Sequence, residues 1–296
     1  MAAVTGPEQG PVGRCCGAPG SASGGPPPAA AWNGMKDWYA SNMSPATASL
    51  ACSLFRHLGL VKPSPTCAGD FLKVLETHCG DAQAASELLP LPCVASFTAC
   101  DFSDGMLSLA AERLGDRGKT VLADSTQLPF EGACFDRYMS NLGCCCTSDL
   151  GLKLKEACRV LVPGGLAAMS MRIADFEGDT GFHLLSSTLE PFGYPGQPNR
   201  EGLHIGKDLP ALRAKCLEAG FASSKAWRTW VTIPIQSVED FMQWTTSQPP
   251  VQKFLNQLSE EKRLEALRSL EAAAQKPVDD GALQLAVAVV VAQAHA

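Results

Sequence analysis

The chain has 296 residues and a formal net charge of −6, so it is long enough for one large domain or two small ones with a sizeable core. Its isoelectric point is near 5.4 and no Lys/Arg cluster stands out, so it lacks the basic face that grips a phosphate backbone, and no nucleic-acid partner is expected. The longest apolar run, residues 286–292, is far shorter than the ~20 residues that cross a bilayer, so no membrane span is expected.

The thirteen cysteines do not form the pattern of a disulfide scaffold. Their number is odd, no CxxC pair occurs, and some are directly adjacent, as in Cys15-Cys16 and Cys144-Cys145-Cys146. The first thirty residues also lack the apolar core of a secretory signal. We therefore expect reduced thiols in a cytoplasmic protein, and no metal site.

The composition divides the chain into a tail and a globular part. Residues 1–31 are rich in Gly, Pro, Ala and Ser and are predicted to be disordered. Residues 44–60 are predicted to form a helix, with Ser44 as its cap and Pro45 in its first turn.

Strands and helices then alternate along the chain. Strands are predicted at 71–76, 95–101, 120–123, 135–140 and 166–171, and helices at 82–89, 103–114 and 150–161. Pro163-Gly164-Gly165 is predicted to be a turn before the last of these strands. The alternation indicates an α/β fold with a doubly wound, Rossmann-like parallel sheet. The remainder is predicted to hold a helix at 209–219, a strand at 223–233, helices within 238–275 and a strand at 283–292.

Acidic residues end successive strands and are predicted to lie at one edge of the sheet. Glu76 ends the first strand, Gly80 follows in the turn, and Asp101 and Asp124 end the next two strands. Gly80 lets a ligand approach the backbone, and Asp101 is placed to accept hydrogen bonds from ribose hydroxyls. The spacing fits several nucleoside ligands. Glu76 would repel a pyrophosphate, and it favours a cationic ligand such as a sulfonium nucleoside.

Several motifs in the same order resemble the class I S-adenosylmethionine-dependent methyltransferases, in particular the type 11 branch that includes quinone-biosynthesis enzymes. These motifs are Val-Leu-Glu-x-x-Cys-Gly (74–80), Cys-Asp-Phe-Ser-Asp-Gly-Met-Leu (100–107), Ala-Asp-Ser-Thr-Gln-Leu-Pro-Phe (123–130), Phe-Asp-Arg-Tyr-Met-Ser-Asn (135–141) and Arg-Val-Leu-Val-Pro-Gly-Gly (159–165). The resemblance covers roughly residues 70–172. It implies a methyltransferase domain over 32–296, a seven-stranded, mostly parallel sheet with an antiparallel C-terminal strand, and a lid that carries the acceptor site at about 173–207.

The resemblance also implies the cofactor, S-adenosyl-L-methionine, and the residues that bind it. Glu76 and Gly80 would bound its methionine end, and Asp101 would take the ribose hydroxyls. Three further residues would lie near the adenine, namely Met106, Asp124 and Ser125, while Asn141 would face the acceptor. The implied reaction is methyl transfer to a small-molecule or lipid-like acceptor, with a protein acceptor as an alternative. The candidates for a general base in the lid are Asp175, His183, Tyr194 and His204.

Two positions depart from the family pattern, because His78 and Ala82 stand where glycine is usual. They motivate an alternative function, a catalytically weakened methyltransferase fold that acts as a binding or scaffold protein. A second alternative, an NAD-dependent oxidoreductase, rests on the spacing of Gly80 and Asp101 alone. His78 is interpreted as a tolerated residue that points outward.

The run Cys144-Cys145-Cys146 follows Asn141 and therefore lies near the expected acceptor. One hypothesis is thiolate chemistry, such as holding a metalloid substrate. The alternative is that these residues only pack, and it is favoured because no positive charge is visible nearby in the sequence.

Overall fold

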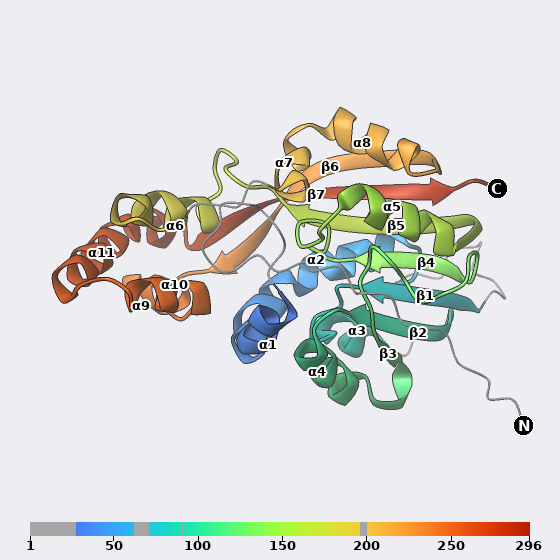
Figure 1. Cartoon of the computed structure of the whole chain (residues 1–296), viewed down its shortest axis with the longest axis horizontal. Coiled ribbons are helices and arrows are strands. Elements are labelled where there is room, and N and C mark those ends of the chain that lie inside the picture. Colours follow the sequence, from blue (N-terminus) through green and yellow to red (C-terminus); the bar gives the residue numbers. More distant parts are fainter. Residues whose placement is uncertain (1–27, 62–70, 90, 196–199) are drawn as a thin grey trace, which may run out of the picture.

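The computed structural model describes residues 28–61, 71–89, 91–195 and 200–296, so residues 1–27 of the tail predicted at 1–31 lie outside the described residues. One seven-stranded sheet runs through the molecule in the order β3-β2-β1-β4-β5-β7-β6 (Figure 1). Its parallel part consists of β1 (Leu72–Thr77), β2 (Val94–Asp101), β3 (Lys119–Leu122), β4 (Phe135–Ser140) and β5 (Leu161–Arg172). β7 (Ala282–Ala294) pairs antiparallel with both β5 and β6 (Phe221–Pro234). The predicted fold class is confirmed.

Helices cover both faces of this sheet because its strands bury side chains on both sides. In β1, Val74 belongs to the apolar cluster on one face and Leu75 to the cluster on the other, and neither side chain is exposed. The first face is covered by α2 (Ser44–His57), α3 (Gln83–Leu88) and α4 (Asp104–Leu114). The second is covered by α5 (Leu150–Val160) and α8 (Leu209–Glu218). The carboxyl ends of the parallel strands are left uncovered by these helices.

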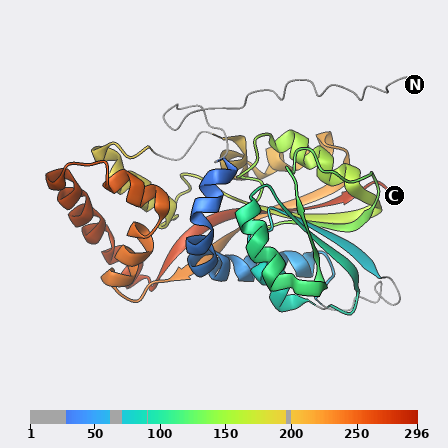
Figure 2. The same cartoon turned by 60° about the horizontal axis from the view of Figure 1, so that its bottom comes forward.

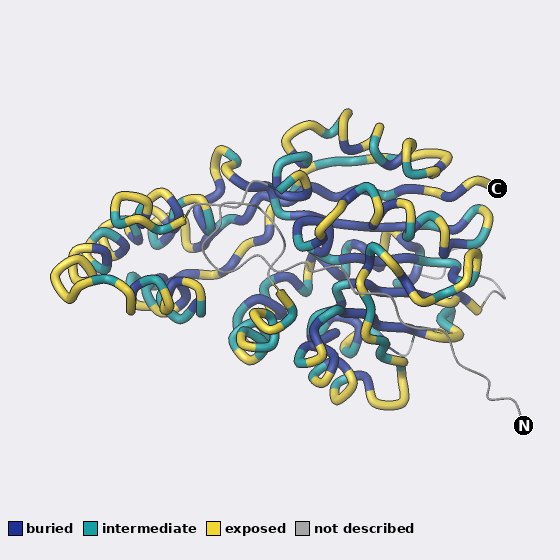
Figure 3. Tube along the Cα trace, in the orientation of Figure 1, coloured by how far each residue is buried: buried dark blue, intermediate teal, exposed yellow. Residues whose placement is uncertain are grey.

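A group of helices, here called the helical lobe, lies beyond the ends of β6 and β7 (Figure 1). It consists of α6 (Phe182–Leu189), α9 (Val238–Thr246), α10 (Pro249–Leu255), α11 (Glu260–Ala273) and α12 (Gln275–Asp279). β6 and β7 are long and extend beyond the parallel strands to the helical lobe. The lobe exposes the outer faces of its helices and buries their inner faces (Figure 3). Of these helices, only α6 falls within the lid expected at about 173–207, and the others come from residues 238–279. That residues 173–207 act as a lid stays a prediction.

The N-terminal helix α1 (Ala29–Trp38) stands between the helical lobe and α4 (Figure 2). It begins within the range predicted to be disordered, and a π-helical turn (Tyr39–Met43) joins it to α2. The remaining short helices are α7 (Glu201–His204) and the 3₁₀ turns Gly115–Arg117, Glu190–Phe192 and Ile205–Lys207. None of the helices in the described ranges is both long and apolar enough to cross a membrane.

Candidate active site

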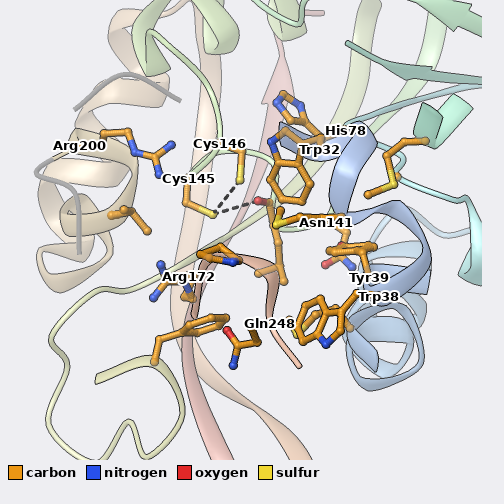
Figure 4. Close-up of a pocket in the computed structure, with 18 of the residues that line it drawn as sticks. Trp32, Trp38, Tyr39, His78, Asn141, Cys145, Cys146, Arg172, Arg200 and Gln248 are labelled. Atoms are coloured by element: carbon orange, nitrogen blue, oxygen red, sulfur yellow. Dashed lines mark hydrogen bonds between the residues drawn. The ribbon is translucent and has the colours of Figure 1, made fainter. Parts of the chain in front are cut away.

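A cavity of about 400 Å³ lies at the carboxyl ends of the strands, between the sheet, α1 and the helical lobe. This volume falls within the range that small-molecule and cofactor sites occupy. The sheet edge contributes His78, Gly80, Asp101, Asn141 and Arg172. The opposite walls come from α1 and the lobe, with Trp32, Trp38, Tyr39, Phe182, Tyr194 and Gln248 (Figure 4).

Asp101 is held rigidly at the end of β2. One carboxylate oxygen accepts a hydrogen bond from the Gly80 N–H (3.0 Å) and the other from the Ser103 N–H (3.0 Å). Burial raises the pKa of Asp101, and these N–H groups partly oppose the effect. Gly80 has φ 56, and a Cβ there would lie 3.3 Å from the Tyr39 ring. The sheet edge thus presents a rigidly held hydrogen-bond acceptor, the Asp101 carboxylate, beside the backbone of Gly80, which has no side chain to block a ligand.

Glu76 lies beside this edge as a buried carboxylate, and its Oε2 has no hydrogen-bond partner among the described residues. It lines a smaller cavity of about 30 Å³ that shares Tyr39 and Asn141 with the larger one. Burial raises its pKa to about 8, with further contributions from Asp81 and Asp101. A cavity of this size has room for a group like a water molecule or an ammonium ion. A positive charge placed there would stabilise the ionised carboxylate.

Hydrogen bonds from Asn33 fasten α1 over the same edge. Its side-chain oxygen accepts from the Ser103 hydroxyl (2.6 Å) and the Gly105 N–H (3.0 Å), and its amide donates to Asp104 (2.6 Å). Trp32 and Tyr39, packed edge to face at 5.8 Å, are thereby held at the cavity. The position of α1 over the sheet edge was not predicted from the sequence. The aromatic residues within 32–39 were the only indication of it.

His78 points into the structure, so the expectation that it points outward is wrong. Its Nδ1 lies 3.0 Å from the ammonium group of Lys153, which is fully buried and also donates to the Thr77 hydroxyl (3.3 Å). Burial, with a contribution from Lys153, lowers the pKa of His78 well below its usual value, so the ring is neutral and accepts this bond. His78 is thus part of the cavity wall.

Both residues that replace glycine adopt left-handed backbone angles, with φ 54 at His78 and φ 52 at Ala82. Replacing Ala82 by glycine is expected to change the free energy of unfolding by less than about 0.5 kcal/mol, although the residue is buried. A left-handed alanine costs roughly 1–2 kcal/mol, the extra freedom of glycine in the unfolded chain offsets about 0.4–1 kcal/mol of that, and loss of the buried methyl group offsets about 0.8 kcal/mol more. Denaturant unfolding measures the difference.

The reverse change at Gly193 provides the control, because this residue is also left-handed, with φ 91 and ψ 19, and has open space around the position of a Cβ. Gly193→Ala should lower the free energy of unfolding by roughly 1 kcal/mol, since it introduces this kind of strain and buries no new methyl group. A loss of about 1.5 kcal/mol in Ala82→Gly would show that the backbone at residue 82 is not strained.

The other residues implied to bind the cofactor lie in different environments. Met106 and Asn141 line the cavity, and the side-chain amide oxygen of Asn141 (Oδ1) accepts a hydrogen bond from the Ser170 hydroxyl (3.0 Å). Asp124 and Ser125 line neither cavity described above. The Asp124 carboxylate instead accepts from the N–H and the hydroxyl of Thr126, both at 2.8 Å. A contact between these two residues and adenine stays a prediction.

The candidate bases from the lid are separated by the fold. Tyr194 lines the cavity and packs edge to face on Phe254 at 5.0 Å. His183 and Asp175 face each other at 3.5 Å with about half of each side chain exposed, and His204 does not line the cavity either. Burial raises the pKa of Tyr194, so its phenol is protonated at neutral pH and can donate a hydrogen bond.

Cys145 and Cys146 line the cavity with their sulfur atoms 3.9 Å apart, whereas Cys144 is fully buried in the core. Arg172 and Arg200 lie nearby, so the expectation that no positive charge is present is wrong. The pKa of Cys145 is lowered to about 6 by its contact with Cys146 and by these two arginines, against the opposing effect of burial. Arg172 ends the last parallel strand and Arg200 precedes α7 as its N-cap, so both are far from Cys145 in the sequence and could not be predicted to lie near it.

Cys145 is therefore expected to react with iodoacetamide at pH 7 faster than Cys144, by tenfold or more. The reason is that a thiolate is the reactive form, and burial raises the pKa of Cys144 to about 11. Peptide mass spectrometry of briefly alkylated protein measures both residues in one sample. Equal labelling of the two cysteines would contradict the assigned environment.

The fold defines a Rossmann-like α/β protein with a pocket at the carboxyl ends of its parallel strands. Residues 75–169 match the family model of a methyltransferase domain. The matched stretch contains the strand-end motifs, so this part of the chain is similar to methyltransferase domains.

Curated relatives resemble only part of the chain. It is 36% identical to a malonyl-[acyl-carrier protein] O-methyltransferase of Erwinia billingiae over 130 residues, which is 42% of this chain and 49% of the relative. It is 40% identical to a demethylmenaquinone methyltransferase of Corynebacterium glutamicum over 93 residues, 31% of this chain and 38% of the relative. The chain thus spans about half or less of the length of these relatives.

Solved structures share the fold over most of the chain. The YcgJ protein of Bacillus subtilis superposes with a TM-score of 0.52 at 15% identity, over 83% of this chain and 99% of that protein. A Bacillus halodurans protein assigned as a methyltransferase gives a TM-score of 0.52 at 18% identity, over 83% and 98%. At these identities the likeness concerns the fold alone.

Proposed function

We propose that this protein transfers the methyl group of S-adenosylmethionine to a small-molecule or lipid-like acceptor. The observation that supports the proposal is the sheet edge itself, where a rigid Asp101 and Gly80 adjoin the buried Glu76, whose Oε2 has no partner among the described residues. A nearby cation would favour the ionised form of Glu76, so this position suits a cationic nucleoside better than a pyrophosphate, which would bring negative charge to a group whose ionisation burial already opposes. The name of the demethylmenaquinone methyltransferases supports a lipid-like acceptor, and that of the malonyl-[acyl-carrier protein] enzyme keeps a protein-bound acceptor as the alternative.

The residues present fit this cofactor. Asp101 would bind the ribose hydroxyls, since each of its oxygens retains a free lone pair beside its backbone bond. Glu76 would bind the cationic methionine end and Met106 would pack near the base. When bound, the cofactor supplies an electrophilic methyl group, so the protein mainly has to position the acceptor.

The acceptor would occupy the part of the cavity that faces the helical lobe. Trp38, Phe182 and Leu185 line it and would exclude water from the reacting groups. The neutral phenol of Tyr194 would orient the acceptor as a hydrogen-bond donor. None of the side chains that line the described cavity is well suited to be a strong base. The site therefore favours acceptors that need little activation.

We also propose a cytoplasmic location. Cysteines other than Cys93 in the described part of the chain, Cys145 among them, are free thiols. Many free thiols in one chain are typical of a reducing compartment.

Methyl transfer is tested by incubating the protein with methyl-labelled S-adenosylmethionine and a metabolite extract. Label should appear in a low-mass compound that separates from protein by filtration. Binding of the cofactor with no transfer of label to any fraction would favour the scaffold alternative. Label found only on protein would favour a protein acceptor.

A further inference from the structure

Three side chains in the cavity carry buried hydrogen-bond donors that have no partner among the described residues. They are the indole N–H of Trp32, two guanidinium nitrogens of Arg200 and the amide nitrogen of Gln248. Gln248 is only 5% exposed, so water does not readily satisfy its amide. Unpaired buried donors cost free energy, and native proteins rarely keep them. A ligand with acceptor oxygens would pair all three.

Positive charge is concentrated on the wall that carries Arg200. Arg172 and Arg200 lie on the same side of the cavity with Cys145 between them (Figure 4). The Arg172 guanidinium stacks 4.3 Å from the centre of the Phe182 ring, which holds it at this wall. Asp101 is the one carboxylate among the described lining residues, and it is bound to Gly80 and Ser103 at the sheet edge.

The remaining surface around these arginines is apolar. Phe182, Leu185, Leu203 and Pro250 line this side of the cavity, and Trp38 faces them from α1. An apolar wall with a few convergent donors is typical of a site for an apolar ligand that carries one polar group. A single negative charge suits the site better than a phosphate dianion, because the carboxylates of Asp81 and Asp101 lie together near Glu76 on the sheet side.

We propose that the acceptor carries a carboxylate on an apolar body, and that Arg200, with Arg172 beside it, binds this carboxylate. Gln248 hydrogen-bonds a further oxygen of the same ligand. The guanidinium geometry matches a carboxylate in a bidentate manner, so Arg200 selects for charge and for shape. The inference rests on the proposed function, since it names the substrate class of that site.

The test compares phenylacetate with phenylacetamide, its neutral isostere, by calorimetric titration with and without S-adenosylhomocysteine. We expect phenylacetate to bind at least tenfold more tightly in both cases. Arg200→Met should abolish this preference and Arg200→Lys should restore part of it. Arg213→Met provides a charge-matched control, because Arg213 is exposed on α8, away from the cavity, and this variant should keep the full preference.

A second readout uses the thiol between the two arginines. Bound phenylacetate should slow alkylation of Cys145 and phenylacetamide should not, because only the anion competes for the positive charge. Equal affinities for acid and amide, or a preference that survives Arg200→Met, would overturn the inference. Binding of S-adenosylhomocysteine without that preference would overturn it and leave the proposed function standing. A preference for phenylacetate over phenylacetamide without binding of S-adenosylhomocysteine would contradict the proposed function and leave the carboxylate site standing.

Discussion

Asp101→Ala is expected to lower the affinity for S-adenosylhomocysteine at least a hundredfold in a calorimetric titration. The carboxylate at the end of β2 would accept hydrogen bonds from two ribose hydroxyls, and hydrogen bonds to a charged group contribute roughly 1.5–3 kcal/mol each. The same change also releases the N–H groups of Gly80 and Ser103, both bound at 3.0 Å. The site would lose both its acceptor and the rigidity of its backbone.

Asp101→Asn separates these two contributions, because an amide keeps one acceptor oxygen but loses the charge. We expect an intermediate affinity. Asp116→Ala is the matched control, because this acid is exposed in the turn Gly115–Arg117 and lies outside the lining of the cavity. Circular dichroism and thermal unfolding verify that each variant is folded. Unchanged affinity in folded Asp101→Ala would show that the ribose does not bind here.

Glu76→Gln has two effects of opposite sign, a gain in stability without ligand and a loss of cofactor affinity. Burial raises the pKa of Glu76 to about 8 in the folded state, against 4.5 for an unperturbed glutamate. Because the folded pKa is raised, its contribution to stability is fully present below pH 4.5 and is lost as the pH rises toward 8. The loss amounts to about 4 kcal/mol by pH 8. A glutamine at position 76 does not ionise, so the Glu76→Gln variant does not lose this stability as the pH rises.

The free energy of unfolding of the ligand-free wild type should therefore fall between pH 5 and 8 more steeply than that of Glu76→Gln. The variant should also bind S-adenosylhomocysteine more weakly at pH 7, since its cationic end would lose a carboxylate partner. Glu87→Gln, which changes an exposed acid on α3, should alter neither quantity. Parallel pH profiles for wild type and Glu76→Gln would contradict the assigned burial and charge environment of Glu76.

The regular part of the fold could be predicted because its signals are local. β4 spans Phe135–Ser140 as expected, and α4 is capped by Ser103, whose hydroxyl accepts from the Met106 N–H. β5 was predicted too short. It begins at Leu161, and the Pro163-Gly164-Gly165 segment is a bulge within the strand, because the register with β4 shifts there. A bulge and a turn use the same residues, and only strand pairing distinguishes them.

The cavity was only partly visible in the sequence. Gly80, Asp101 and Asn141 lie together because parallel strands end at one edge, a property that follows from motif order. Trp32, Arg200 and Gln248 come from a helix in a low-complexity neighbourhood, the start of α7 and the cap of α10. Long-range packing of the helical lobe and α1 brings them together, and no local pattern encodes it.

The most direct test of the central proposal is a calorimetric titration of the intact wild-type chain with S-adenosylhomocysteine and, separately, with NAD. A sheet edge with Asp101 beside the buried Glu76 predicts saturable binding of S-adenosylhomocysteine in the micromolar range and no binding of NAD. Binding of NAD alone would contradict the proposal and favour an oxidoreductase. Binding of neither ligand would also contradict it, since Glu76 would then have no cationic partner.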